Sequence, residues 1–111
     1  MAKLEEYRQH VQQLLTKYSS YKPAYGDVEV ETIFDTKQDR YLIVSVGWES
    51  KHRVYGCSIH IDIKDEKIWI QQNRTEIDIA KELAALGVSK QDIVIGFHSP
   101  TIRKFTEFAV G

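Results

Sequence analysis

Hydrophobic residues near the start of the chain recur at intervals of three and four. They fall at Leu4, Tyr7, Val11, Leu14, Leu15 and Tyr18. This spacing places them on one face of a helix and leaves the polar side chains on the other. We therefore expect an amphipathic helix from Lys3 to Ser20, ended by the proline and glycine within residues 21–26.

The next part of the chain has the pattern of strands. Hydrophobic and polar residues alternate in Val28–Asp35 and Val54–Ile63, and Tyr41–Trp48 is an apolar run. Ile68–Gln72 follows the turn at residues 64–67 and completes a hairpin with the third segment. Because strand side chains point alternately to two faces, five residues of the third segment should face inward: Tyr55, Cys57, Ile59, Ile61 and Ile63. The four segments predict an antiparallel meander of about four strands.

The last third of the chain predicts a second helix and a short strand. Thr75–Asp78 has the form of an acidic capping box, and Gly87 is placed to end the helix that follows. That helix should bury Ile79, Leu83 and Leu86. Ile93–Phe97 is an apolar strand candidate, and residues 105–110 fit either strand or coil. The fold class is therefore α+β.

The amino-acid composition limits the classes of protein to which this chain can belong. The 111 residues are 42% hydrophobic and 28% charged, which suits one ordered domain over residues 1–111. Lys and Arg total 15 against 16 Asp and Glu, so no long-range positive field attracts nucleic acid. Cys57 is the only cysteine, which excludes an internal disulfide. The N-terminal segment lacks a signal-peptide pattern and no apolar stretch is long enough to span a membrane, so we expect a cytoplasmic location.

Six segments carry a family resemblance. They are YGDVEVETIFD (25–35), VGWE (46–49), RVYGCSIHIDIKDEKIWIQQ (53–72), TEIDIAKELAALGV (75–88), GFHSP (96–100) and FTEFAV (105–110). In number and order they resemble the XisI-type fdxN element excision controlling factors of cyanobacteria. The resemblance covers almost the whole chain.

The resemblance implies a single XisI-like domain that acts as a non-enzymatic accessory factor in programmed excision of a DNA element. It also implies that the protein acts together with a site-specific recombinase and with a XisH-like partner, whose fold is similar to that of restriction-type nucleases. Many relatives have Asp-Gly in the hairpin where this chain has Asp65-Glu66, so we expect a looser or longer turn here.

Ser58, His60 and Asp62 match the residue types of a catalytic triad and lie two residues apart. Residues at this spacing on a strand are about 6–7 Å apart, which disfavours direct hydrogen bonds between their side chains. No glycine-rich elbow follows Ser58. We therefore expect no catalytic residues.

Two metal-site hypotheses are weak. Cys57 and His60 are three residues apart, which on a regular strand sends them to opposite faces. Asp27, Glu29, Glu31 and Asp35 form an acidic set that could hold Mg²⁺ or present a negative surface to a partner. A solvated strand face is the simpler interpretation, so we expect neither a metal nor a cofactor.

A small basic and aromatic set could contact nucleic acid. It comprises His52, Arg53, His98, Arg103 and Lys104, interleaved with Tyr55, Phe97 and Phe105. No helix-turn-helix pattern or basic helix accompanies it. An alternative function is thus a small architectural cofactor that binds DNA directly, although DNA contact should be weak.

A nearly neutral chain without catalytic residues should act through a local protein-binding surface. We place that surface on Trp48, Phe97, His98, Arg103 and Lys104, because interfaces favour Arg and aromatic anchors. Arg103 is expected to be an exposed charge. We also expect a homodimer, because a four-stranded sheet with two clear helices leaves one face thinly covered.

Overall fold

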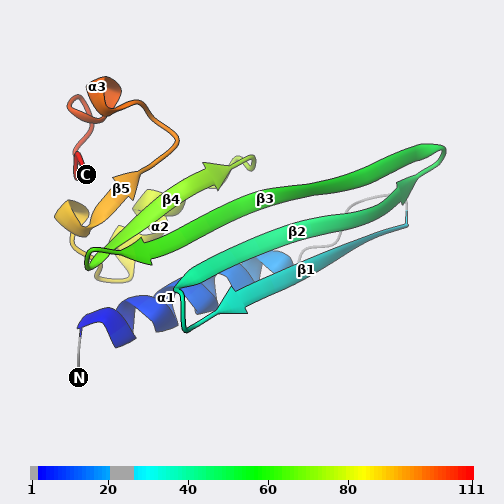
Figure 1. The fold of residues 1–111 in the computed structure, drawn as a ribbon, viewed down its shortest axis with the longest axis horizontal. Helices are drawn as coiled ribbons and strands as arrows, with labels where there is room; N and C mark the ends of the chain where they lie inside the picture. Colours follow the sequence, from blue (N-terminus) through cyan, green and yellow to red (C-terminus); the bar gives the residue numbers. More distant parts are fainter. Residues whose placement is uncertain (1–2, 21–26) are drawn as a thin grey trace.

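The computed structural model describes residues 3–20 and 27–111, so the turn expected within residues 21–26 lies outside the described part. The elements are α1 (Lys3–Ser19), β1 (Asp27–Asp35), β2 (Arg40–Glu49), β3 (His52–Lys64), β4 (Lys67–Asn73), α2 (Ile79–Ala85), a 3-10 turn (Lys90–Asp92), β5 (Ile93–Ile95) and α3 (Pro100–Arg103). Figure 1 shows their arrangement. None of these helices is long and apolar enough to cross a membrane.

The strands form one sheet in the order β1-β2-β3-β4-β5, with the first four in the expected antiparallel meander. β5 lies parallel to β4, because the chain crosses over through α2 before it returns to the sheet. The α+β class is confirmed. β3 pairs with β4 only from Ile59 onward, so the β2–β3 hairpin extends beyond the rest of the sheet (Figure 1).

The core lies between one face of the sheet and the two longer helices. α1 contributes Tyr7, Val11, Leu14 and Leu15, as the helical spacing predicts. Ile59, Ile61 and Ile63 of β3 meet Ile79 and Leu83 of α2 in the same cluster. The prediction that Leu86 is buried is wrong, because its side chain is 43% exposed at the end of α2.

The opposite face of β1, β2 and β3 carries no helix in Figure 1, and we call it the open face. Its positions are Asp27, Glu29, Glu31 and Ile33 on β1, Leu42, Val44, Val46 and Trp48 on β2, and Arg53, Tyr55, Cys57 and His60 on β3. Tyr55 and Cys57 are therefore not inward as predicted, and Tyr55 is 73% exposed. The reason is a bulge: Ile43 pairs with Ile59 and Val44 with Cys57, which leaves Ser58 as an extra residue that shifts the alternation.

The caps of α2 differ partly from the prediction. Asp78, not Thr75, is the N-cap residue, and its side chain accepts a hydrogen bond from the Lys81 backbone N–H. Thr75 instead donates its own N–H to the side chain of Asn73, so it belongs to the preceding turn. Gly87 ends the helix as predicted, at φ +104°.

The β3–β4 turn is tighter than expected. Lys64 pairs directly with Lys67, so the loop contains only Asp65 and Glu66, at φ 53° and 62°. The expectation of a looser or longer turn is wrong, because both residues adopt the left-handed conformation that a two-residue hairpin requires. Glycine would adopt it without the steric cost that Glu66 carries.

Candidate protein-interaction surfaces

Arg103 links separate parts of the C-terminal segment through hydrogen bonds to backbone carbonyls. Its guanidinium donates at 3.0 to 3.4 Å to four backbone carbonyls, those of Ile95, Gly96, His98 and Val110. The same group lies over the ring of Trp69, 5.3 Å from the centroid. The prediction that Arg103 is an exposed charge is wrong: it is a positioning residue that joins β5, α3 and the chain end. Sequence could not indicate this, because its partners are backbone carbonyls.

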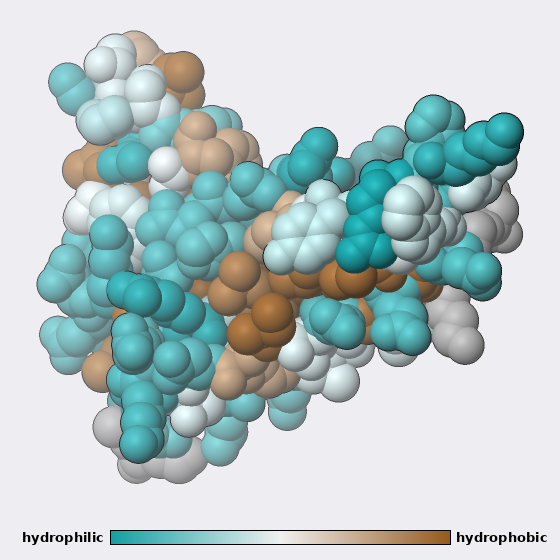
Figure 2. Space-filling model, turned by 45° about the vertical axis from the view of Figure 1, so that its right-hand side comes forward, coloured by the Kyte–Doolittle hydropathy of each residue, from teal (hydrophilic) through white to brown (hydrophobic). Residues whose placement is uncertain are grey.

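The segment that Arg103 holds exposes three large apolar side chains. Phe97 is 51% exposed, Ile102 51% and Phe105 85%, and Lys104 beside them is also exposed. We call these four residues the C-terminal surface; Figure 2 shows apolar side chains on this part of the molecule at the upper left. Ile102 was missed from the sequence, although its three-residue spacing from Phe105 after the Ser99 cap was a usable signal.

Two residues of the predicted partner surface occupy different settings. His98 packs edge-on against Phe97, with ring centroids 4.8 Å apart, so it supports the C-terminal surface. Trp48 is 50% exposed but lies near the tip of the β2–β3 hairpin, where Arg53 lies 5.4 Å from its ring centroid. Figure 1 places this tip at the opposite end of the long axis from α3, so Trp48 does not belong to the same surface.

His60 and Asp62 do contact each other, contrary to the spacing argument. His60 Nε2 lies 2.8 Å from Asp62 Oδ1, because the two side chains reach toward each other along one face of β3. Gln71 Nε2 donates to the other carboxylate oxygen at 3.2 Å. Ser58 lies in the bulge and directs its hydroxyl to the Ile43 carbonyl at 3.3 Å, so the three residues do not assemble a triad.

The bulge also overturns the argument about Cys57 and His60. The register pairs Cys57 with Val44 and His60 with Leu42, which are two positions of the open face, so the two residues share a face. Burial raises the pKa of the Cys57 thiol. Within residues 3–20 and 27–111, no three His, Cys, Asp or Glu side chains are grouped so that they could hold a metal ion.

Comparison with known proteins now identifies the family. Residues 1–110 match the sequence profile of the XisI protein family. The chain belongs to the XisI family. A XisI-like protein from Anabaena variabilis is 44% identical and has a TM-score of 0.91, with 97% of this chain and 99% of that chain covered. The fdxN element excision controlling factor XisI from Anabaena variabilis is 34% identical with a TM-score of 0.83, over 99% of this chain and 100% of that one. A search of curated proteins gave no match.

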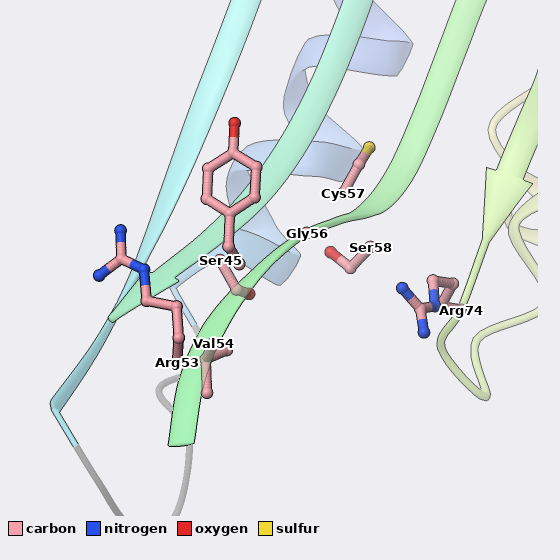
Figure 3. A pocket seen from close by; sticks show the side chains of 8 residues that line it. Ser45, Arg53, Val54, Gly56, Cys57, Ser58 and Arg74 are labelled. Carbon is pink, nitrogen blue, oxygen red and sulfur yellow. The ribbon is translucent and has the colours of Figure 1, made fainter. Parts of the chain in front are cut away.

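One pocket of this XisI-family chain has a volume of about 330 Å³ and lies beside the free part of β3. Ser45, residues 53–58 and Arg74 line it. Figure 3 shows the side chains of Arg53 and Arg74 on opposite sides of β3. Their guanidinium groups therefore do not converge on one anion, as a phosphate site would require.

The charged residues considered as binding candidates are dispersed over the XisI-family fold. Asp27, Glu29 and Glu31 are exposed along one edge of the open face, and Asp35 instead accepts the Lys37 and Gln38 backbone N–H groups. His52 and Arg53 lie near the hairpin tip, whereas Lys104 lies beyond α3. The basic candidates thus form no continuous patch with the C-terminal surface.

Proposed function

We propose that this XisI-family protein is a non-enzymatic accessory factor that controls programmed excision of a DNA element. It acts by binding a XisH-like protein of nuclease fold and, directly or through that protein, a site-specific recombinase. The observation that carries the proposal is the 34% identity, over 99% of the chain, to a protein described as an fdxN element excision controlling factor.

The C-terminal surface is the proposed binding site for the XisH-like partner. Aromatic and aliphatic anchors beside a positive charge are typical of interface centres, and Phe105 is the most exposed large apolar residue among those described. Ser99 caps α3 and Arg103 ties the segment to β5, so the surface is ordered before binding. Less conformational entropy is then lost when a partner docks.

Local charge favours protein binding over the alternative of direct DNA binding. The net charge is -1, and the acidic edge formed by Asp27, Glu29 and Glu31 would repel phosphates. Lys104 is the one cation of the C-terminal surface, and it suits an acidic rim on a protein partner. We also propose that the protein acts as a homodimer, because the open face carries no helix in Figure 1.

The test is co-purification with a XisH-like protein, followed by titration of the complex. Phe105→Ala should weaken binding by about thirtyfold, the effect of losing one anchor worth about 2 kcal/mol, and Lys104→Glu should also weaken it. Glu76→Arg reverses an exposed charge outside the C-terminal surface and serves as the control. Absence of a complex, together with a DNA mobility shift by the chain alone at physiological salt, would replace this proposal with the architectural alternative.

A further inference from the structure

The open face is built in rows that cross β1, β2 and β3. One row is Asp27, Trp48 and Arg53; the next is Glu29, Val46 and Tyr55; the third is Glu31, Val44 and Cys57. Each row begins with a carboxylate on β1 and has an apolar side chain on β2 at its centre. The face therefore has an acidic edge, an apolar middle and an edge on β3 that carries Arg53.

The middle of this face is apolar and partly accessible. Val44 is buried and Leu42 and Val46 are half-buried, whereas Trp48 is 50% and Tyr55 73% exposed. Figure 2 shows apolar side chains as a brown band along this part of the surface, with hydrophilic side chains beside it. An apolar patch rimmed by charges is typical of a protein interface.

The two edges of the face are complementary to each other. Consider a second copy stacked face to face, with the two-fold axis parallel to β2. This rotation places β1 of each copy opposite β3 of the other and β2 opposite β2. Carboxylates of Asp27 and Glu29 then meet Arg53 and the Tyr55 hydroxyl of the partner copy, and every contact occurs twice. An axis perpendicular to the strands would instead oppose acid to acid, which is unfavourable.

We propose that a second copy of this chain docks on the open face about a two-fold axis parallel to β2. This inference rests on the homodimer clause of the proposed function and names its surface, and it does not depend on the XisH-like partner. The acidic edge excludes nucleic acid from the same face, because phosphates would lie against three carboxylates.

The small size of the face indicates a weak dimer. Nine residues of β1, at about 3.3 Å each, and three strands about 4.8 Å apart give roughly 400 Å² per copy. The pair buries about 800 Å², which is below the roughly 1,200 Å² of a standard stable interface. The dimer should therefore form in the micromolar range and weaken between about 50 mM and about 500 mM salt.

Sedimentation velocity over a concentration series tests the charge pairing. Arg53→Glu alone, and Asp27→Arg with Glu29→Arg, should each weaken the dimer by at least about tenfold, because like charges then oppose each other. The three changes combined restore opposite charges and should return the dissociation constant to within about threefold of the original. Glu76→Arg is the matched control, and a thermal melt of each variant checks that it folds.

A cysteine cross-link tests the axis. In a Cys57→Ser background, Val46→Cys lies on β2 beside the axis. Stacked sheets pack about 10 Å apart, which is too far for a direct disulfide, so a short bifunctional thiol cross-linker should give the covalent dimer. Thr32→Cys is the control, because Thr32 is exposed but pairs with Ile43, away from the open face. If the chain stays monomeric to about 1 mM at low salt, any self-association is very weak. That result overturns both the dimer and its surface, and it does not affect the proposed XisH-like complex. A dimer that resists both charge reversals overturns this surface alone.

Discussion

Arg8 and Asp39 are joined by two parallel hydrogen bonds, from Nε to Oδ1 at 2.7 Å and from Nη2 to Oδ2 at 3.0 Å. The Tyr41 hydroxyl donates to the same carboxylate at 3.0 Å, and the Ile63 backbone N–H donates to the Asp39 carbonyl at 2.9 Å. Asp39 thus connects α1, the β1–β2 turn and β3. Its side chain is only 15% exposed, so these bonds are partly shielded from water.

Asp39→Asn should lower the free energy of unfolding by about 1–2 kcal/mol, because a neutral amide cannot accept both Arg8 hydrogen bonds. Asparagine tolerates the φ of 56° at this position, so the backbone is not strained by the change. Urea denaturation measures the effect. Asp65→Asn is the control: Asp65 has φ 53° but is exposed, and its change should cost less than about 0.5 kcal/mol. Equal losses in the two variants would contradict the prediction.

The Asp39 carboxylate should also make stability depend on pH. Its hydrogen bonds with Arg8, followed by the bond from Tyr41, lower the pKa of Asp39 in the folded protein. A lowered folded-state pKa means that the stabilisation is complete above the unfolded value of about 3.9 and is lost as the pH falls below it. The stability difference between the original chain and Asp39→Asn should therefore be constant near pH 7 and shrink below about pH 4. Denaturation midpoints at pH 7, 5 and 3 measure it, and a difference that grows in acid would have the wrong sign.

Local periodicity was sufficient to predict most of the fold. Val11 and Leu15 are buried because helical spacing alone decides which face of α1 is apolar, and Ile59, Ile61 and Ile63 follow the same logic on a strand. The bulge at Ser58 was not predictable, because it depends on how β2 and β3 align. It reversed the expected positions of Tyr55 and of Cys57 relative to His60.

The candidate surfaces were predicted only in part. The exposure of Phe97 and Lys104 agrees with the expected surface loop. Arg103 instead donates hydrogen bonds to backbone carbonyls, which have no sequence signature. Trp48 and Phe97 were grouped by residue type, and residue type does not place two segments in space. The complementary rows of the open face also required the strand register, because they join residues from three strands.

Glu66→Gly should stabilise the protein by about 0.5–1 kcal/mol, because Glu66 adopts φ 62° in the two-residue β3–β4 turn. Glycine loses more chain entropy on folding, which offsets part of the steric relief, so the gain stays modest. Thermal and urea denaturation measure it. Lys37→Gly provides the contrast: Lys37 lies in the β1–β2 turn and is not among the residues with positive φ, so its change should destabilise. A loss of stability in Glu66→Gly would show that the left-handed turn is not strained.

Arg103→Ala should loosen residues 96–111 without unfolding the sheet. A hydrogen bond from a charged group to a carbonyl contributes about 1.5–3 kcal/mol. Arg103 reaches four carbonyls at 3.0 to 3.4 Å, two of which share its single Nε–H. The core isoleucines of β3 and β4 do not depend on them. Hydrogen exchange measured by segment should therefore speed up in the C-terminal segment and stay slow in β3.

Arg103→Lys distinguishes geometry from charge. A lysine keeps the positive charge but replaces the planar fork of donors with one compact ammonium, which cannot reach carbonyls spread from Ile95 to Val110. Arg103→Lys should therefore speed hydrogen exchange almost as much as alanine does. Lys104→Ala, at the exposed neighbour, should leave the hydrogen-exchange rates unchanged. Both Arg103 variants should weaken the XisH-like complex because Phe97 and Phe105 are then no longer held in place, although Arg103 itself is turned inward. Slow exchange in Arg103→Lys would mean that charge alone suffices, and unchanged exchange in Arg103→Ala would mean that the four bonds do not hold the segment.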